Sequence, residues 1–142
     1  MQIQTIIGKE FAKKVIPLIK TAQKSIDIIV YNWYWYEDQP ASDIQKFNTA
    51  IVQAAYKNIS VRVITNAIRP VNILTRNKVL AKQWYHRKNL HAKLMIIDGA
   101  TAILGSHNYT MNAFSRNLEL SVIISDKNTV QSLSAYFGEL WQ

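Results

Sequence analysis

The chain has 142 residues, of which 49% are hydrophobic, and its 17 basic and 9 acidic side chains give a formal net charge of +8. This length and composition predict one globular domain, and no apolar run is long enough to span a membrane. The absence of cysteine excludes disulfides and thiolate metal sites. The positive charge favours a polyanionic partner, either nucleic acid or an anionic membrane surface.

The N-terminal segment predicts a helix followed by a buried strand. Residues 1–11 do not resemble a signal peptide, because charged side chains interrupt the apolar run, so we expect a cytoplasmic location unless a signal has already been removed. Apolar side chains recur near helical spacing over residues 9–23, although Pro17 should kink or interrupt that helix. Residues 25–31 are apolar and β-branched, which is typical of a buried strand.

A dense aromatic cluster, residues 32–38, follows that strand at the kind of sheet edge where open α/β sheets place their sites. Its rings could form a stacking wall for bases or an apolar lip for lipid, or half of them could belong to the core or to a subunit interface. Residues 41–58 predict a second helix with Ser42 as its N-cap, and residues 59–65 predict the next strand. Strand, helix and strand in this order imply a right-handed parallel crossover.

From residue 69 to residue 89 the chain is basic, contains no acidic side chain and has aromatic residues interleaved. This pattern resembles a groove that follows a phosphate backbone. The alternative is that residues 79–85 form a helix whose basic face is only solvated, with His86 as an ordinary surface residue. The side chains that we expect to contact nucleic acid are Arg69, Arg76, Lys78, Lys82, Trp84, Arg87 and Lys88.

Residues 91–108 predict a hairpin that gathers polar side chains at one place. Two aliphatic runs are separated by an Asp-Gly turn at hairpin spacing. Side chains two positions apart on a strand share a face, so His91 and Lys93 lie together, and the second run delivers Ser106 and Asn108 to the same end of the sheet. An imidazole, an ammonium, a hydroxyl and an amide suit the binding and attack of a phosphate.

The remaining segments predict one more strand and a closing helix. Residues 109–116 read as a polar loop, 117–125 as a strand and 126–141 as an amphipathic helix capped by Asp126 or by the serine before it. Glu119 lies within the predicted strand between two leucines, where a carboxylate needs a partner.

The spacing of the hairpin residues resembles a known pattern. His-x-Lys, four residues, Asp, six residues and then Gly-Ser-x-Asn is the pattern of the phospholipase D superfamily, the HKD phosphodiesterases. The resemblance implies an α/β fold, a phospholipase D-like mixed sheet with helices on both sides, in a single domain over residues 1–142 with one motif at 91–108. It also implies that Asp98 and Gly105 are structural members of the motif and that Glu119 orients a catalytic histidine.

The same resemblance implies how a site of this kind assembles and reacts. Larger relatives carry two motifs in one chain, whereas the small bacterial endonucleases carry one and pair two chains. This chain has one motif and no internal repeat, which implies a homodimer with a shared site.

In that shared site one His91 would attack phosphorus to form a phosphohistidine, and the partner's His91 would protonate the leaving oxygen and then activate water. Lys93, Ser106 and Asn108 would hold the non-bridging oxygens, and Glu119 would accept a proton from the other nitrogen of His91 across the dimer. No metal or cofactor is expected, because Lys93 supplies the positive charge that a metal would supply.

The sequence is compatible with three functions. The first is a metal-independent nuclease acting on nucleic acid, with DNA favoured over RNA. The second is a phospholipase D or phosphatidyl transferase that uses residues 33–36 to contact a membrane. The third is a non-catalytic nucleic-acid-binding domain of a larger enzyme. The charge and the basic-aromatic stretch favour the first.

Overall fold

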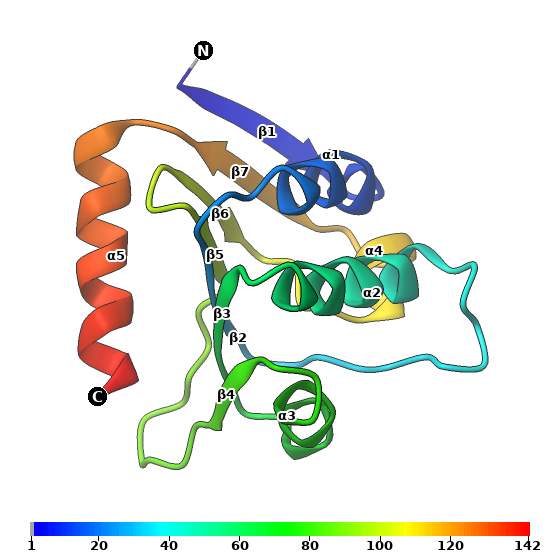
Figure 1. Cartoon of the computed structure of the whole chain (residues 1–142). Helices are drawn as coiled ribbons and strands as arrows, with labels where there is room; N and C mark the ends of the chain where they lie inside the picture. Colours follow the sequence, from blue (N-terminus) through cyan, green and yellow to red (C-terminus); the bar gives the residue numbers. More distant parts are fainter. Residues whose placement is uncertain (1) are drawn as a thin grey trace.

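The computed structural model describes residues 2–142 as one mixed sheet with helices packed on it (Figure 1). The strand order is β1-β7-β6-β5-β2-β3-β4. Strands β2, β3 and β4 are parallel, and all other neighbours are antiparallel. The predicted mixed sheet is therefore confirmed. The bounds in chain order are β1 (Ile3–Ile7), α1 (Glu10–Lys20), β2 (Ser25–Val30), α2 (Asp43–Tyr56), β3 (Ser60–Thr65), α3 (Ile68–Thr75), β4 (Leu80–Gln83), β5 (Leu94–Ile97), β6 (Thr101–Gly105), α4 (Met111–Ser115), β7 (Leu120–Ile124) and α5 (Lys127–Trp141).

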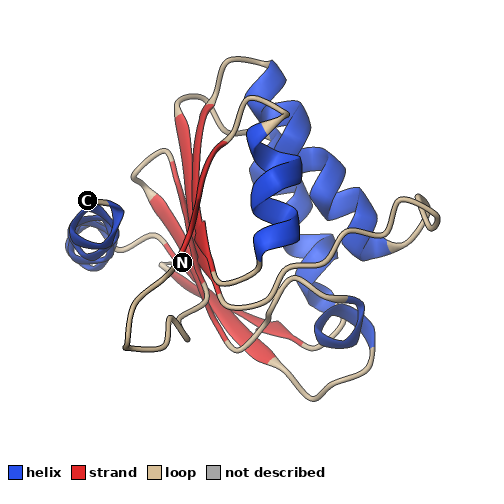
Figure 2. Cartoon of the chain, turned by 90° about the horizontal axis from the view of Figure 1, so that it is seen from below, coloured by secondary structure: helices blue, strands red, loops and turns tan. Residues whose placement is uncertain are grey.

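Helices cover both faces of the sheet, as predicted. Figure 2 shows α1 to α4 on one face and α5 alone on the other. Successive residues of β2 point to opposite faces, so Ile28 packs in the larger core beneath α1 and α2, whereas Ile29 packs in a smaller core with Val130 and Phe137 of α5. Burial of nearly every residue of β2 is therefore the consequence of a sheet covered on both sides, and its one charged residue, Asp27, pairs with Arg62 of β3 at 2.8 Å.

The predicted helices begin where the sequence places their caps. The Ser42 hydroxyl accepts a hydrogen bond from the Gln45 N–H, and the Asp126 carboxylate accepts one from the Thr129 N–H. The helix expected over residues 9–23 continues as one element through Pro17. Among residues 2–142 no helix has the length and apolar composition needed to cross a bilayer.

Three segments differ from the sequence-based expectation. The helix considered for residues 79–85 is wrong, because Leu80–Gln83 form an edge strand paired with β3. The segment expected to be a polar loop contains α4, in which Thr110 caps the Ala113 N–H and the apolar pair Ala113 and Phe114 is buried. The N-terminal residues add β1, which pairs with β7 and completes the sheet.

Candidate active site

The two strands of the predicted hairpin deliver the motif to one edge of the sheet. β5 runs antiparallel to β2, and Leu94 pairs with Ile29, so His91 and Lys93 lie beside the end of β2. Leu94 also pairs with Leu104 of β6, so the residues that follow β6 emerge at the same edge. The structure thus brings His91, Lys93, Ser106 and Asn108 to one edge, as the sequence predicts.

His91 and Lys93 are in direct contact. The Lys93 Nζ lies 3.2 Å from the His91 Nδ1. The His91 ring is exposed and lies against the Tyr31 ring at 5.4 Å between centroids. Burial lowers the pKa of Lys93 below its ordinary value, and the negative charge of Glu119 opposes that shift. Lys93 is therefore a partly buried cation that shares its surroundings with a histidine and a carboxylate.

Glu119 finds its partners within the same chain. The Ser106 hydroxyl donates to Glu119 Oε1 at 2.5 Å, and the Asn117 side-chain amide donates to Oε2 at 3.0 Å. The Leu120 N–H in turn donates to the Ser106 hydroxyl oxygen at 3.1 Å. Glu119 immediately precedes β7 and does not lie inside the strand. Its bonding to His91 across a dimer stays a prediction.

Asn108 is fixed by the segment that follows β2. Its side-chain carbonyl accepts the Asn32 N–H at 3.0 Å, which leaves the amide N–H groups of Asn108 facing away from this bond. The Tyr109 N–H donates to the Asn32 carbonyl, and Trp33 and Tyr109 form an isolated β-bridge. The chain after β6 is therefore held along the aromatic cluster.

Gly105 and Asp98 support the motif from its ends. A Cβ atom on Gly105 would lie 2.5 Å from the Leu120 carbonyl oxygen, so only glycine permits this approach of β6 and β7. Asp98 lies at the opposite edge of the sheet, in the hairpin turn, with a φ of 57° that is followed by a positive φ at Gly99. Both residues therefore lie in the backbone framework of the hairpin, and their structural roles in the motif stay a prediction.

The Asp98 carboxylate ties the hairpin turn to the start of β2. It accepts the backbone N–H groups of Gln23, Lys24 and Ser25 at 2.7 to 3.1 Å. Burial acts to raise the pKa of Asp98, but these backbone donors outweigh it and hold the pKa below its usual range. Asp98 therefore sets the register of β5 on β2 rather than contacting the candidate site.

Sequence reasoning assigned no role to His107, which the structure buries beneath the motif. Its Nδ1 accepts from the Ser121 hydroxyl at 2.7 Å, and its Nε2–H donates to the Gly8 carbonyl at 2.9 Å. The Gly8 carbonyl can only accept, so Nε2 carries a proton, and burial lowers the pKa of His107, which favours the neutral ring with Nδ1 as the acceptor. The ring also lies 4.5 Å from the Phe11 ring, between centroids. In the sequence His107 stands between two polar residues, which give no signal that it is buried and bonded in this way.

The aromatic cluster of residues 32–38 is divided between the core and the surface. Trp33 is fully buried and meets Tyr109 edge to face, whereas Tyr34 is 53% exposed. Two open cavities share Tyr34 and Tyr36 as a common wall. One, of about 400 Å³, is polar and includes Asn108; the other, of about 380 Å³, is apolar and lies against the start of α3.

The structure separates the residues of the predicted basic stretch, 69–89, in space. Because α3 connects the end of β3 to the start of the parallel β4, Arg76 and Lys78 lie at the edge opposite His91. Arg87 and Lys88 follow β4 and lie toward the His91 edge, where the Trp84 indole N–H donates to the Lys88 carbonyl.

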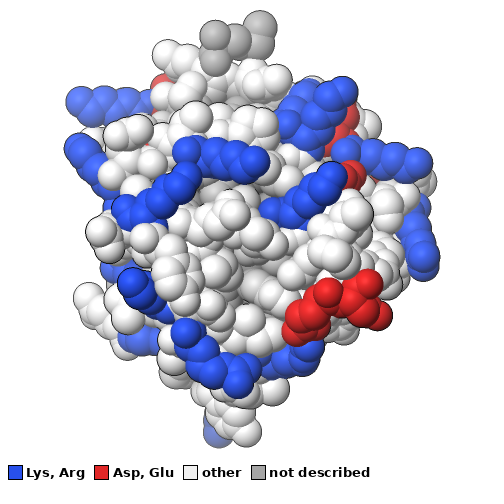
Figure 3. Space-filling model, turned by 45° about the vertical axis from the view of Figure 1, so that its right-hand side comes forward, with Lys and Arg blue, Asp and Glu red and all other residues white. Residues whose placement is uncertain are grey.

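The two remaining basic residues of that stretch have partners of their own. Arg69 binds Glu37 at 2.7 Å, and Lys82 binds the Trp141 carbonyl at 2.6 Å. The face in Figure 3 shows lysine and arginine spread over the surface rather than gathered in one patch.

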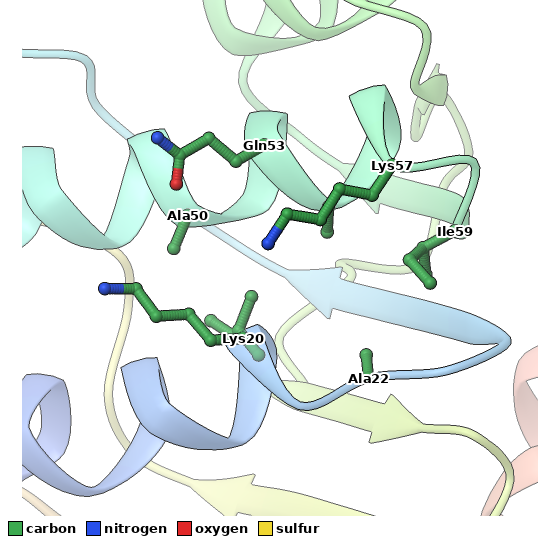
Figure 4. A pocket seen from close by; sticks show the side chains of 8 residues that line it. Lys20, Ala22, Ala50, Gln53, Lys57 and Ile59 are labelled. Carbon is green, nitrogen blue, oxygen red and sulfur yellow. The ribbon is translucent and has the colours of Figure 1, made fainter.

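Two further features bear on what the chain could bind. A crevice of about 10 Å³ lies between α1 and α2, with Lys20 and Lys57 along its walls (Figure 4). It has room for about one water and lies at the edge opposite the motif, so we assign it no role. Across residues 2–142, histidine and acidic side chains do not gather in groups of three that could hold a metal ion.

Comparison with known proteins identifies the family. The family model described as the PLD-like (phospholipase D-like) domain of cardiolipin synthase matches residues 15–141. A probable cardiolipin synthase of Bacillus subtilis, YwiE, is 29% identical over 135 residues, covering 86% of this chain and 25% of YwiE. The mitochondrial cardiolipin hydrolase of Chlamydomonas reinhardtii is 22% identical over 134 residues, covering 90% of this chain and 56% of the hydrolase. The chain thus spans a quarter of one curated relative and little more than half of the other.

A solved structure matches at full length. Nuc of Salmonella typhimurium, a phospholipase D family member, has a TM-score of 0.82 and 19% identity, covering 99% of this chain and 95% of Nuc. At that identity the likeness shows the fold alone. The family model, by contrast, covers nearly the whole chain, the hairpin and Glu119 included. The chain therefore belongs to the phospholipase D superfamily, as a phospholipase D-like domain.

Proposed function

We propose that the protein is a metal-independent nuclease that hydrolyses nucleic-acid phosphodiester bonds through a phosphohistidine at a site shared by two copies of the chain. The observation that carries this proposal is the convergence of His91, Lys93, Ser106 and Asn108 on one edge of the sheet, with the Lys93 ammonium touching the His91 ring. A nucleophile, a fixed cation and neutral donors are what attack on a phosphodiester requires.

In a single chain the Nδ1 of His91 contacts an ammonium, that of Lys93, and not a carboxylate. An ammonium has no acceptor, so when Lys93 donates to Nδ1 the neutral imidazole carries its proton on Nε2. Attack on phosphorus from Nε2 needs the other tautomer, with a proton on Nδ1 and a carboxylate to accept it. We assign that carboxylate to Glu119 of the partner subunit.

Two histidines then divide the proton transfers. The His91 Nε2 lone pair attacks phosphorus, the bond to the leaving oxygen breaks, and the partner's His91, protonated beforehand, donates its proton to that oxygen. The same ring then removes a proton from water, whose oxygen attacks phosphorus and displaces His91. Lys93, Ser106 and Asn108 stabilise the charge on the non-bridging oxygens in both steps.

An apolar surface beside Glu119 supports the second copy. Ile7, Leu118 and Leu120 are exposed around a cavity of about 260 Å³ that Glu119 also lines, and Leu118 is exposed completely. Large apolar side chains grouped on a surface mark an interaction site. Glu119 lies in this surface and is proposed to bind the His91 of a second copy. We therefore propose that a second copy of the chain covers the surface.

Lipid phosphodiesters are the second candidate substrate, and two observations favour them. The curated relatives are named as cardiolipin enzymes, and the apolar cavity between the aromatic cluster and α3 could take an acyl chain. The net charge of +8 suits either polyanion. A non-catalytic nucleic-acid-binding role is less well supported, because the four residues assigned to the chemistry, His91, Lys93, Ser106 and Asn108, converge at one edge.

One assay panel separates these functions. Plasmid, single-stranded DNA, RNA and vesicles of phosphatidylcholine or cardiolipin are each incubated with the protein, with and without excess EDTA. We expect cleavage of nucleic acid that persists in EDTA and disappears in His91→Ala. Turnover of vesicles alone would establish the lipid function, and activity that EDTA abolishes and Mg²⁺ or Zn²⁺ restores would contradict the metal-free mechanism.

A further inference from the structure

A polar cavity of about 400 Å³ opens directly beside Asn108, and the proposed chemistry leaves it unused. Its walls come from the chain that follows β2 and from the loop that carries α4. The size is within the range of small-molecule sites. The lining residues are Asn32, Tyr34, Tyr36, Asn108, Thr110, Met111, Asn112, Arg116 and Asn117.

The walls of this cavity are held in place by bonds that leave much of their hydrogen-bonding capacity free. The Met111 N–H donates to the Tyr36 hydroxyl at 3.0 Å, and Asn117 is anchored on Glu119. Among the bonds within residues 2–142, none involves the side-chain amide of Asn32 or the hydroxyl of Tyr34. The cavity is therefore preorganised and presents free donors and acceptors.

The chemistry of the lining favours a neutral, planar, polar ligand. Four of its side chains are amides, which both donate and accept, and none carries a carboxylate. Arg116 is the single cation, whereas a headgroup with several phosphates needs more than one. Amide and guanidinium groups are the side chains that pair with the edges of bases, and Tyr34, half exposed at the rim, offers a face for stacking.

We infer that this cavity binds the nucleobase adjacent to the scissile phosphate, an inference that rests on the proposed nuclease function. Asn108 connects the candidate active site to the cavity, because it belongs to the motif and also lines the cavity. A base can enter only after it leaves its stack, and unstacking costs least in a single strand. The protein should therefore cleave single-stranded nucleic acid faster than the corresponding duplex.

The test compares two substrates that share the diester and differ in the base. Single-stranded 12-nucleotide DNA is one, and bis(4-nitrophenyl) phosphate, which has no base, is the other. In Asn112→Ala we expect kcat/KM for the oligonucleotide, relative to the base-free diester, to fall about tenfold. Tyr34→Leu should lower the same ratio. Asn128→Ala, on α5 and on the other face of the sheet, is the matched control and should leave the ratio unchanged.

Binding gives a readout that does not depend on turnover. Fluorescence anisotropy of the labelled 12-mer should show a Kd about tenfold weaker for Asn112→Ala than for Asn128→Ala. Circular dichroism shows whether each variant is folded. Wild-type cleavage of DNA with an unchanged ratio and unchanged Kd in both cavity variants would overturn the base site while leaving the nuclease intact. Wild-type turnover of vesicles but not of DNA would overturn the nuclease itself.

Discussion

At the scale of single residues, burial decides which histidine can react. His91 is exposed and touches a cation, whereas His107, on the next strand end, is buried with both ring nitrogens bonded. The two rings occur within one motif, and the structure shows that only His91 is accessible to a substrate. A measurement of stability against pH tests the buried state of His107 without any assay of activity.

The stability of the protein should fall as the pH drops below the ordinary pKa of histidine because of His107. Burial lowers the pKa of His107, although the Gly8 carbonyl and the charge of Glu119 act in the opposite direction. The unfolded chain, with a pKa near 6.5, then binds more protons than the folded chain at mildly acidic pH. The contribution is present above that value and is lost progressively below it.

Urea unfolding at pH 7.5, 6.5 and 5.5 measures this effect. We expect His107→Gln to be less stable than wild type at pH 7.5 but to lose less stability on acidification. His86→Gln, which changes an exposed histidine, should keep the wild-type pH dependence. If His107→Gln shows the wild-type slope, the buried neutral ring is not the cause.

At the scale of elements, the motif hairpin could be predicted because its signals are local. Two aliphatic runs around Asp98-Gly99 predict the turn, and the positive φ at both positions agrees with that choice. β1 gave little signal, because only Ile6 of its five residues is buried and its partner strand is over a hundred residues away. α4 has five residues, too few for a helical period to show.

The hairpin turn should depend on the carboxylate of Asp98. Asp98→Asn keeps the size of the side chain but removes the ionised acceptor of three backbone N–H groups. We expect the free energy of unfolding to fall by about 1–3 kcal/mol at pH 7, measured in urea. Asp38→Asn, an exposed aspartate, should change it little.

Acid also removes the contribution of Asp98, but here the folded protein stabilises the charged form of the group, whereas at His107 it stabilises the neutral form. The folded pKa of Asp98 is held below its ordinary 3.8, so its contribution is complete above that value and is lost as the pH falls through the folded pKa. Equal stabilities of Asp98→Asn and wild type at pH 7 would contradict the anchoring role.

At the scale of the whole molecule, topology overrides the order of charges in the sequence. The basic stretch was expected to form one surface, but α3 carries the chain from the end of β3 to the start of β4, and β4 then crosses the sheet again, so the basic side chains lie at two opposite edges. The motif residues could be placed from the sequence because a hairpin fixes both strand ends. The basic residues could not be placed from the sequence, because the strand over residues 80–83, which crosses the sheet once more, was not predicted.

This placement divides the basic residues into a pair toward the motif and a pair away from it. We expect the double substitution Arg87→Glu and Lys88→Glu to weaken DNA binding and to reduce the log–log salt slope by about 1–2. The double substitution Arg76→Glu and Lys78→Glu makes the same change in charge at the other edge. Anisotropy measured over a range of salt concentrations compares them, and equal losses would mean that net charge alone attracts DNA.

The central claim is that two copies of His91 share one site, and counting phosphohistidines tests it most directly. The protein is mixed with a ³²P-labelled diester, quenched within the first turnover, and analysed for acid-labile, base-stable phosphate by mass spectrometry. The account predicts label on His91, at no more than one per two chains, with none in His91→Ala. One labelled His91 in every chain, or turnover without any labelled histidine, would contradict it.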